Sequence, residues 1–407
     1  MSVMDATRNP YTPNAGAVPP LIAGRDDLEA SFRLLLSRLS LGRSEQSMII
    51  TGLRGVGKTV LLEQFRQIAD AAHWVVIDRE ISKHDDIDFR RSLTAWMRSA
   101  LLSLSPREQW DDRLRHALSV LRSFSLSVDP DGRLSAGLDV GVQYGVGDQG
   151  VLQQDVVDLF VAAGEAAAAH RRGIVLLLDE IQFLNRLQLE SLIIGLHKAV
   201  QRNLPVTLVG AGLPQIPEMA GDAKSYAERL FVFPQISNLP DDQARIALHT
   251  PALVEGVRWT DAALAVAVAR TEGYPYFLQE LGYAAWLVAH DNTITALDVE
   301  QAIPSYEDKL DSSFFRVRLD RATELQRAYL RAMAELGPGA QKAADVASLL
   351  GRASNQVGPT RSELTSMGLL FAPQHGYAAF TVPQFDRFLK RAIPEFIAPP
   401  IQRRQGG

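Results

Sequence analysis

Eight residues, GLRGVGKT from Gly52 to Thr59, have the types and spacing that can hold a chain of phosphates. They fit the pattern G-x-x-x-x-G-K-[ST], in which glycines let the backbone amides approach phosphate oxygens and the following helix start adds a partial positive charge. Lys58 would neutralise the terminal phosphates, and the Thr59 hydroxyl would bind magnesium. The predicted ligands are therefore ATP and Mg²⁺. The predicted nucleotide contacts in this loop are Gly52, Arg54, Gly55, Val56, Gly57, Lys58, Thr59 and Val60.

Two acidic residues provide the second half of this chemistry. The apolar run from Ile174 ends in Asp179 and Glu180, about 120 residues after the loop. Asp179 can hold magnesium through water, and Glu180 can act as the general base that polarises an attacking water. Gln182 either helps to orient that water or is an ordinary polar residue at a helix start. With the phosphate-binding loop, the acidic pair predicts an ATP hydrolase in which Lys58 and Glu180 are catalytic.

The segments that must position these groups alternate between short apolar runs and amphipathic stretches. Strands are expected from Ser47, Trp74, Ile174, Val206 and Leu230. Helices are expected over 25–41, after Lys58, over about 89–104 and up to about Gln201. Strands that are separated by helices predict a parallel sheet with helices on both faces, which is the α/β fold of a P-loop NTPase core.

The length of 407 residues suggests two or three domains. Four prolines predict an extended N-terminal arm over 1–20. It is followed by the ATPase core (21–239), a helical lid (240–305), a third unit (314–393) and a tail (394–407). Within the core, strict alternation around an Asp-Gly turn predicts a β-hairpin insertion over 124–144. Its apolar face either packs on the core or forms a wedge for DNA or another subunit.

The unit over 314–393 shows three helical segments and then a two-stranded pattern, which is the order of a winged helix-turn-helix. If it contacts DNA, the candidate residues are Arg352, Asn355, Gln356 and Arg361. Pro359 would either delay the start of the third helix or bend it. The alternative is that this unit contacts the ATPase core or another protein.

Composition narrows the classes of protein. The net charge is −5, yet residues 321–404 hold eleven Lys and Arg against six Asp and Glu, and this local excess suggests a polyanionic partner. The absence of cysteine excludes disulfides and thiolate metal sites. The eight histidines show no metal spacing, so we expect no metal besides Mg²⁺. The longest apolar run is too short for a membrane span and no secretory signal is visible, so we expect a cytoplasmic protein without a membrane partner.

Five segments, taken in order, resemble AAA+-type ATPases of the origin-recognition (ORC/Cdc-like) and STAND groups. They are AGRDDLEASF (23–32), GLRGVGKT, LLLDEIQ, SYAERLF (225–231) and TEGYPYFLQEL (271–281). The resemblance covers roughly residues 20–395 and includes a C-terminal winged-helix unit.

This resemblance implies roles for further residues. Arg25 would lie near the base and ribose, and Arg229 would stabilise the terminal phosphate in its own or a neighbouring subunit. Gly273, Tyr274 and Pro275 match the GxP element of the lid, so Pro275 would meet the nucleotide. The alternatives are that Arg25 is only a helix-start arginine, that Arg229 forms a surface salt bridge, and that the GxP element is a lid turn without nucleotide contact.

One departure from the family concerns the strand VTLVG and the AGLP that follows it. The family usually places a polar residue there that senses the attacking water, whereas this chain has Ala211 and glycines. The departure implies hydrolysis that is slow or controlled by a partner or oligomer. Two functions stay open. One is an ATP-dependent switch whose nucleotide state controls assembly or association with double-stranded DNA. The other is a regulatory switch that binds protein partners without DNA.

Overall fold

The computed structural model describes residues 4–14, 16–126, 129, 140–143 and 145–398. The chain divides into two compact units. The first, which we call the sheet unit, consists of 24–52 and 58–236, and the second, the helical unit, of 1–23, 53–57 and 237–407. None of the helices in the described residues combines the length and the apolar character that crossing a membrane requires.

The described residues of the sheet unit form one parallel sheet of five strands, in the order β2-β3-β4-β1-β5. The strands are β1 (Ser47–Thr51), β2 (Val75–Glu80), β3 (Ile174–Asp179), β4 (Val206–Gly212) and β5 (Phe231–Val232). All residues of β1, β3 and β4 are buried, as expected for central parallel strands that helices cover on both faces. The predicted parallel sheet is therefore confirmed.

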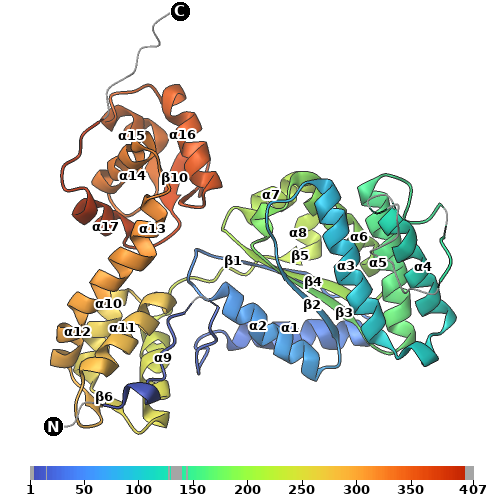
Figure 1. The fold of residues 1–407 in the computed structure, drawn as a ribbon, viewed down its shortest axis with the longest axis horizontal. Helices are drawn as coiled ribbons and strands as arrows, with labels where there is room; N and C mark the ends of the chain where they lie inside the picture. Colours follow the sequence, from blue (N-terminus) through green and yellow to red (C-terminus); the bar gives the residue numbers. More distant parts are fainter. Residues whose placement is uncertain (1–3, 15, 127–128, 130–139, 144, 399–407) are drawn as a thin grey trace, which may run out of the picture. The chain divides into compact units, whose positions relative to one another are not determined.

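Helices cover both faces of this sheet (Figure 1). They are α1 (Asp26–Ser40), α2 (Lys58–Ala71), α3 (Asp86–Leu104), α4 (Asp112–Leu126), α5 (Leu152–Ala169), α6 (Arg186–Gln201), α7 (Ile216–Ala223) and α8 (Ala227–Leu230). On one face α1 packs on α2, with the rings of Phe32 and Phe65 stacked 4.3 Å apart between centroids. On the other face α3, α5 and α6 bury a continuous apolar core, against which α4 also packs.

The hairpin that was predicted over 124–144 is wrong at its start. Phe124 and Leu126 belong to α4, in which Leu114, Leu118 and Leu121 are buried at helical spacing. Phe124 continues that buried stripe. Over so few residues, apolar positions on one side of a helix can also fit the alternation of a strand, which is why the pattern predicted a hairpin. Residues 140–143 have no regular structure, and positions 127–128, 130–139 and 144 lie outside the described residues.

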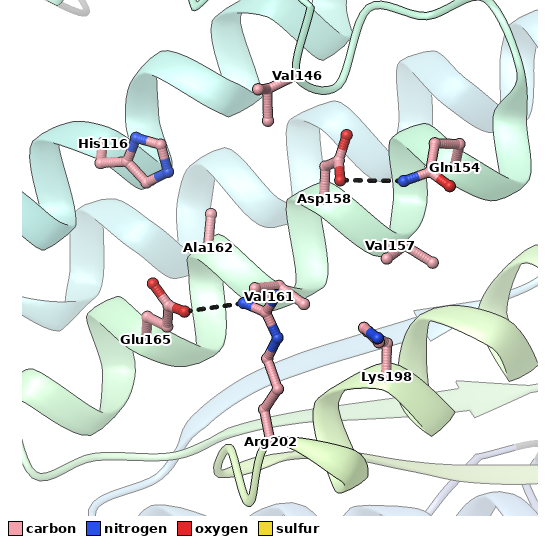
Figure 2. A pocket seen from close by; sticks show the side chains of 10 residues that line it. All are labelled: His116, Val146, Gln154, Val157, Asp158, Val161, Ala162, Glu165, Lys198 and Arg202. Atoms are coloured by element: carbon pink, nitrogen blue, oxygen red, sulfur yellow. Dashed lines mark hydrogen bonds and ion pairs between the residues drawn. The ribbon is translucent and has the colours of Figure 1, made fainter.

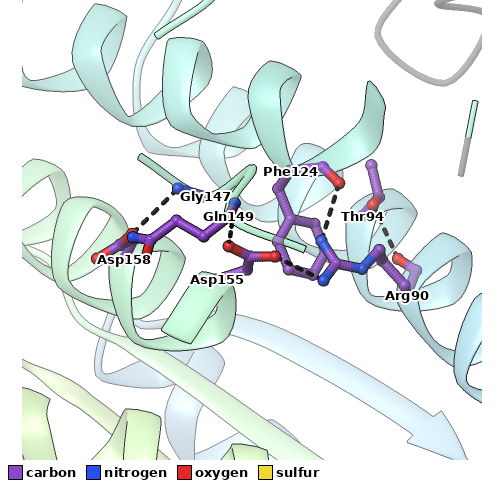
Figure 3. A network of polar contacts seen from close by, with 7 residues as sticks. All are labelled: Arg90, Thr94, Phe124, Gly147, Gln149, Asp155 and Asp158. Carbon is purple, nitrogen blue, oxygen red and sulfur yellow. Dashed lines mark hydrogen bonds and ion pairs between the residues drawn. The ribbon is translucent and has the colours of Figure 1, made fainter. Parts of the chain in front are cut away.

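A buried ion pair anchors the segment before α5 (Figure 3). Arg90 of α3 donates from Nη2 to Asp155 Oδ2 at 2.7 Å, and both side chains are almost fully buried. The guanidinium also donates to the Phe124 carbonyl at 3.3 Å and lies 4.4 Å from the centroid of that ring. The other carboxylate oxygen of Asp155 accepts from the Gln149 backbone amide at 2.8 Å. These contacts join α3, α4 and α5 to the segment that leads into α5.

The segment that the sequence predicts as a helical lid is, in its described residues, a bundle of four helices: α9 (Asp241–Val254), α10 (Asp261–Thr271), α11 (Pro275–Val288) and α12 (Ala296–Lys309). Strands β6 (Arg258–Trp259) and β7 (Thr293–Ile294) pair beside it. The N-terminal segment packs on this bundle rather than standing free. Tyr11 is buried; its hydroxyl donates to the Leu248 carbonyl and accepts from Trp259 Nε1 at 2.7 Å. Gly282 leaves room for its ring, since a Cβ there would lie 2.8 Å from a ring carbon.

The C-terminal part of the helical unit follows through a π-helical segment (Leu310–Phe315) and α13 (Arg316–Leu319). Its elements are α14 (Glu324–Leu336), β8 (Gln341–Lys342), α15 (Ala343–Leu349), α16 (Ser354–Ser366), β9 (Leu370–Phe371), β10 (Tyr377–Phe380) and α17 (Phe385–Ala392). The described strands form an antiparallel sheet, β8-β10-β9. Helix, strand, two helices and a strand pair is winged-helix order. A delayed start of α16 is wrong: the helix begins at Ser354 and continues through Pro359.

Candidate functional site

The clearest functional geometry in the sheet unit joins the start of α2 to the end of β3. Thr59 Oγ1 donates to Asp179 Oδ2 at 2.5 Å, and the backbone amide of Glu180 donates to Asp179 Oδ1 at 2.8 Å. A hydroxyl and a carboxylate are the oxygen ligands that Mg²⁺ prefers. No group of three His, Asp or Glu side chains in the described residues could hold a metal ion by itself. A magnesium ion here would therefore complete its ligands with water and phosphate oxygens.

Lys58 is the first residue of α2 and is buried, with 5% of its surface exposed. Its Nζ donates to the Gly52 carbonyl at 3.0 Å, and the Gly52 amide donates to the Gly212 carbonyl at 3.1 Å. Gly57 has a φ of +95°, which strongly favours glycine, and a Cβ added there would meet no atom within 4 Å. Val56 is buried and Val60 half-buried. The lysine is thus held at the base of the loop, and Gly57 borders open space.

Glu180 directly follows β3 in a left-handed backbone conformation, with φ of 53°. Its carboxylate accepts a hydrogen bond from Gln182 Nε2. The other end of that amide, Gln182 Oε1, accepts from the Leu213 backbone amide at 3.3 Å, just beyond β4. The structure thus brings the proposed general base together with Gln182, whose role the sequence left open.

The two arginines that the family resemblance singled out occupy different environments. Arg25 is the N-cap residue of α1, where burial lowers the pKa of its guanidinium and Nη1 donates to the Gly24 carbonyl at 3.3 Å. Arg229 lies in α8 with its side chain exposed. Within the described residues its guanidinium forms no ion pair, so the salt bridge considered as its alternative role is absent there.

Comparisons with known proteins identify the sheet unit's family. The family model of the AAA ATPase domain matches residues 22–209. These residues form an AAA ATPase domain. A second family model, described as a domain of unknown function (DUF8462), matches residues 312–389. No curated protein sequence matches the chain.

Several solved structures resemble the chain at low sequence identity. A Walker-type ATPase of Pyrococcus abyssi is 14% identical with a TM-score of 0.54, over 91% of this chain and 96% of that one. The Orc1 protein of Aeropyrum pernix in complex with DNA is 15% identical with a TM-score of 0.43, over 94% and 95%. The RuvB branch migration motor of Thermotoga maritima is 16% identical with a TM-score of 0.43, over 88% and 92%. The Pyrococcus structure shows a shared fold.

The GxP turn of the lid has specific geometry within the helical unit, which also contains residues 53–57. Gly273 has a φ of +68°, and a Cβ there would lie 2.3 Å from the Leu239 carbonyl oxygen, so the position needs glycine. Burial raises the pKa of the Tyr274 hydroxyl, so this hydroxyl stays protonated, and it donates a hydrogen bond to the Arg54 carbonyl. Pro275 is the first residue of α11. Arg54 also donates its backbone amide to the Thr381 carbonyl at 3.3 Å.

The four DNA-contact candidates differ in accessibility. Asn355 is exposed on α16, and so is Gln356, although Gln356 Oε1 caps the helix by accepting from the Ala353 amide at 3.0 Å. Arg352 and Arg361 are half-buried. Burial raises the pKa of the Tyr329 hydroxyl, and the nearby charge of Arg361 partly opposes this, so Arg361 lies on the side of α16 that faces α14. The fully exposed residues of α16, all of which are described, include no Lys or Arg.

Part of the positive charge near the C-terminus is neutralised within the helical unit. Arg387 of α17 pairs with Glu272 at 2.7 Å, and Arg391 pairs with Asp311 at 2.6 Å. The predicted polyanionic partner rests on a charge excess that includes these arginines. In the structure they form ion pairs with carboxylates of the helical bundle and of the π-helical segment.

A cavity of about 280 Å³ lies among α4, α5 and α6 (Figure 2). Two contacts satisfy polar side chains at its wall: Glu165 accepts from the guanidinium of Arg202 at 3.2 Å, and Asp158 accepts from the amide of Gln154 at 3.3 Å. Arg202 follows the C-terminal end of α6, whereas Glu180 and Asp179 precede the start of that helix. The cavity therefore extends toward the end of the sheet at which the strands begin, away from the phosphate-binding loop, and it is not part of that site.

Proposed function

We propose that this chain binds ATP with Mg²⁺ at residues Gly52–Val60 and hydrolyses it slowly, and that the bound nucleotide controls its assembly or its association with DNA. The observation that carries the proposal is the 2.5 Å contact between Thr59 Oγ1 and Asp179 Oδ2. The contact joins residues 120 positions apart, at the start of one helix and the end of one strand. A P-loop NTPase needs both oxygens at a single magnesium ion.

Each residue of the site has a separate task in this proposal. The backbone amides of the loop bind phosphate oxygens, and Lys58 moves from the Gly52 carbonyl to the terminal phosphates. Thr59 and Asp179 would hold Mg²⁺, which would neutralise the charge that develops on the phosphates. Glu180 accepts a proton from the attacking water. Arg229, exposed and without an ion pair in the described residues, is available to stabilise the terminal phosphate in its own or a neighbouring subunit.

The nucleotide contacts outside the loop are also proposals. We propose that Arg25, half-buried at the start of α1, contacts the base and ribose, and that Pro275, the first residue of α11, contacts the nucleotide. These contacts would act by shape and hydrogen bonding rather than by catalysis. Their loss would therefore weaken ATP binding without removing the reacting groups.

A switch that binds protein partners and not DNA is the second candidate, and one observation favours it. The outward side of α16 exposes Asn355 without an exposed Lys or Arg on the same helix. Neutralising phosphates supplies most of the affinity in nonspecific DNA binding, so a recognition helix without exposed cations is poorly equipped for it. DNA association would then depend on cations outside this helix.

Fluorescence anisotropy of labelled duplex DNA separates the two candidates. The wild-type chain and the Arg361→Glu variant are titrated with and without ATP and Mg²⁺, across a salt series. Binding that weakens with salt, changes with ATP and falls in the variant supports DNA association through the winged-helix elements. No binding in any nucleotide state leaves the protein-partnered switch.

A further inference from the structure

The tips of β3 and β4 in the AAA ATPase domain are joined by one side chain. Gln182 Nε2 donates to the Glu180 carboxylate, while Gln182 Oε1 accepts from the Leu213 amide at 3.3 Å. The second bond fixes which end of the amide is the oxygen, because only an acceptor can face a backbone N–H. The first bond therefore presents a donor to Glu180.

The glycine at the end of β4 makes room for this arrangement. A Cβ added to Gly212 would lie 2.5 Å from Gln182 Oε1, which is too close for any real contact. β4 itself contributes no polar side chain at this tip, since its last residues are Gly210, Ala211 and Gly212. The space that a polar residue of β4 would fill is thus occupied by an amide that comes from just beyond β3.

Glu180 is consequently held at two points. Its backbone amide donates to Asp179 Oδ1 at 2.8 Å, and its carboxylate accepts from Gln182. The residue adopts φ of 53°, an uncommon conformation for glutamate, which surrounding contacts must maintain.

We propose that Gln182 is the positioning residue for Glu180, and that it provides, between the tips of β3 and β4, the polar contact that the side chains of β4 do not provide. The inference rests on the proposed ATP hydrolysis and goes beyond it by naming the residue that orients the general base. Gln182 acts through Glu180, so its loss lowers the rate of the chemical step and leaves the affinity for MgATP unchanged.

The test compares single-turnover hydrolysis and binding of a non-hydrolysable ATP analogue with Mg²⁺. In Gln182→Ala the rate falls at least about tenfold, as expected when a reacting group loses its orientation, and the dissociation constant changes less than about twofold. Gln182→Glu has nearly the same size and keeps an acceptor for the Leu213 amide, but it has no donor for Glu180 when ionised. It is slow as well if donation to Glu180 is what matters.

Two glycine variants on the same strand separate the amide's role from general crowding. Gly212→Ala displaces the Gln182 amide and lowers the rate, although its Cβ also crowds the flexible end of the Ile216 side chain, at 2.8 Å. Gly210→Ala is the matched control, because it crowds only such an end, that of the Ile181 side chain at 2.7 Å, and leaves the rate near the wild-type value. In the double variant Gly212→Ala/Gln182→Ala the collision with the amide is gone. Its rate therefore equals that of Gln182→Ala alone.

A measurement without nucleotide provides an independent readout. In hydrogen exchange, the Leu213 amide loses protection in Gln182→Ala because its acceptor is absent, while amides in the middle of β4 keep theirs. Wild-type hydrolysis rates in Gln182→Ala, or faster ones, would overturn the inference while the proposed function stands. A wild-type chain that neither binds nor cleaves MgATP would overturn both.

Discussion

The contacts of the buried pair Arg90–Asp155 predict how much the free energy of unfolding falls when one partner is removed. The change is Asp155→Ala. It removes the carboxylate that accepts from Arg90 Nη2 at 2.7 Å and from the Gln149 amide at 2.8 Å. The Arg90 side chain, only 7% exposed, remains between α3 and α5 with its charge.

Removing one partner of a buried ion pair costs about 3–5 kcal/mol, because the other charge is left without compensation. Arg90 keeps the Phe124 carbonyl at 3.3 Å and the Phe124 ring at 4.4 Å, so the lower end of that range applies. The expected loss in free energy of unfolding is about 3 kcal/mol. The double variant Arg90→Met/Asp155→Leu removes both charges and should come within about 2 kcal/mol of the wild type.

Native-state hydrogen exchange on peptides of α5 measures this loss within the AAA ATPase domain itself, independently of the helical unit. The matched control is Asp88→Ala, also at α3, where the pair with Arg91 is about half exposed on both sides. That change should cost less than about 1 kcal/mol. The reasoning is refuted if Asp155→Ala costs no more than this control, or if the double variant is less stable than Asp155→Ala.

Three further predictions concern the site and its surroundings. Glu180→Gln should bind MgATP with unchanged affinity while phosphate release falls about 10²–10⁴-fold, the usual worth of general base catalysis, and undiminished release would remove Glu180 as the base. Arg229→Ala should lower phosphate release at least about tenfold with little change in affinity, and an unaltered rate would leave Arg229 as a surface residue. Burial and the Glu63 carboxylate raise the pKa of Asp78, so its ionised form is disfavoured in the folded state. Asp78→Asn should therefore raise the melting temperature at pH 7, an advantage that disappears as the pH falls below about 4, where the carboxyl is protonated in both states; equal melting temperatures at pH 7 would contradict this.

The sheet and the core of the site were predictable from local sequence patterns. Central parallel strands are buried on both faces, so the runs at Ser47–Thr51 and Ile174–Asp179 are continuous and apolar. The GLRGVGKT spacing fixed the loop between a strand and a helix, and the acids at the end of β3 were expected to meet it. In the structure the first of these acids, Asp179, accepts a hydrogen bond from Thr59 at the end of the loop.

The parts that sequence analysis missed depend on contacts between distant residues. The burial of Tyr11 depends on the absent side chain of Gly282, and the bridge made by Gln182 depends on the absent side chain of Gly212. A pattern within one segment carries no information about a space that another segment leaves open. At Phe124, conversely, a local alternation was overruled by the helical stripe of α4.

The pairing of Arg387 and Arg391 with carboxylates belongs to the same class of contact. Net charge along the sequence counts these arginines as available, but the fold places acids against them. Charge along the sequence therefore does not identify a partner, whereas the residues of the nucleotide site are recognisable because they are close in sequence or lie at the ends of neighbouring elements.

Binding of ATP with Mg²⁺ to the wild-type chain and to Lys58→Ala, measured by calorimetric titration, shows whether the loop at Gly52–Thr59 is the nucleotide site. Lys58 lies at the start of α2, where its Nζ donates to the Gly52 carbonyl, and we assign it to the terminal phosphates. We predict that the wild type binds and that Lys58→Ala loses measurable binding while keeping its fold by circular dichroism. Equal affinity in the two proteins would contradict the assignment of the nucleotide site.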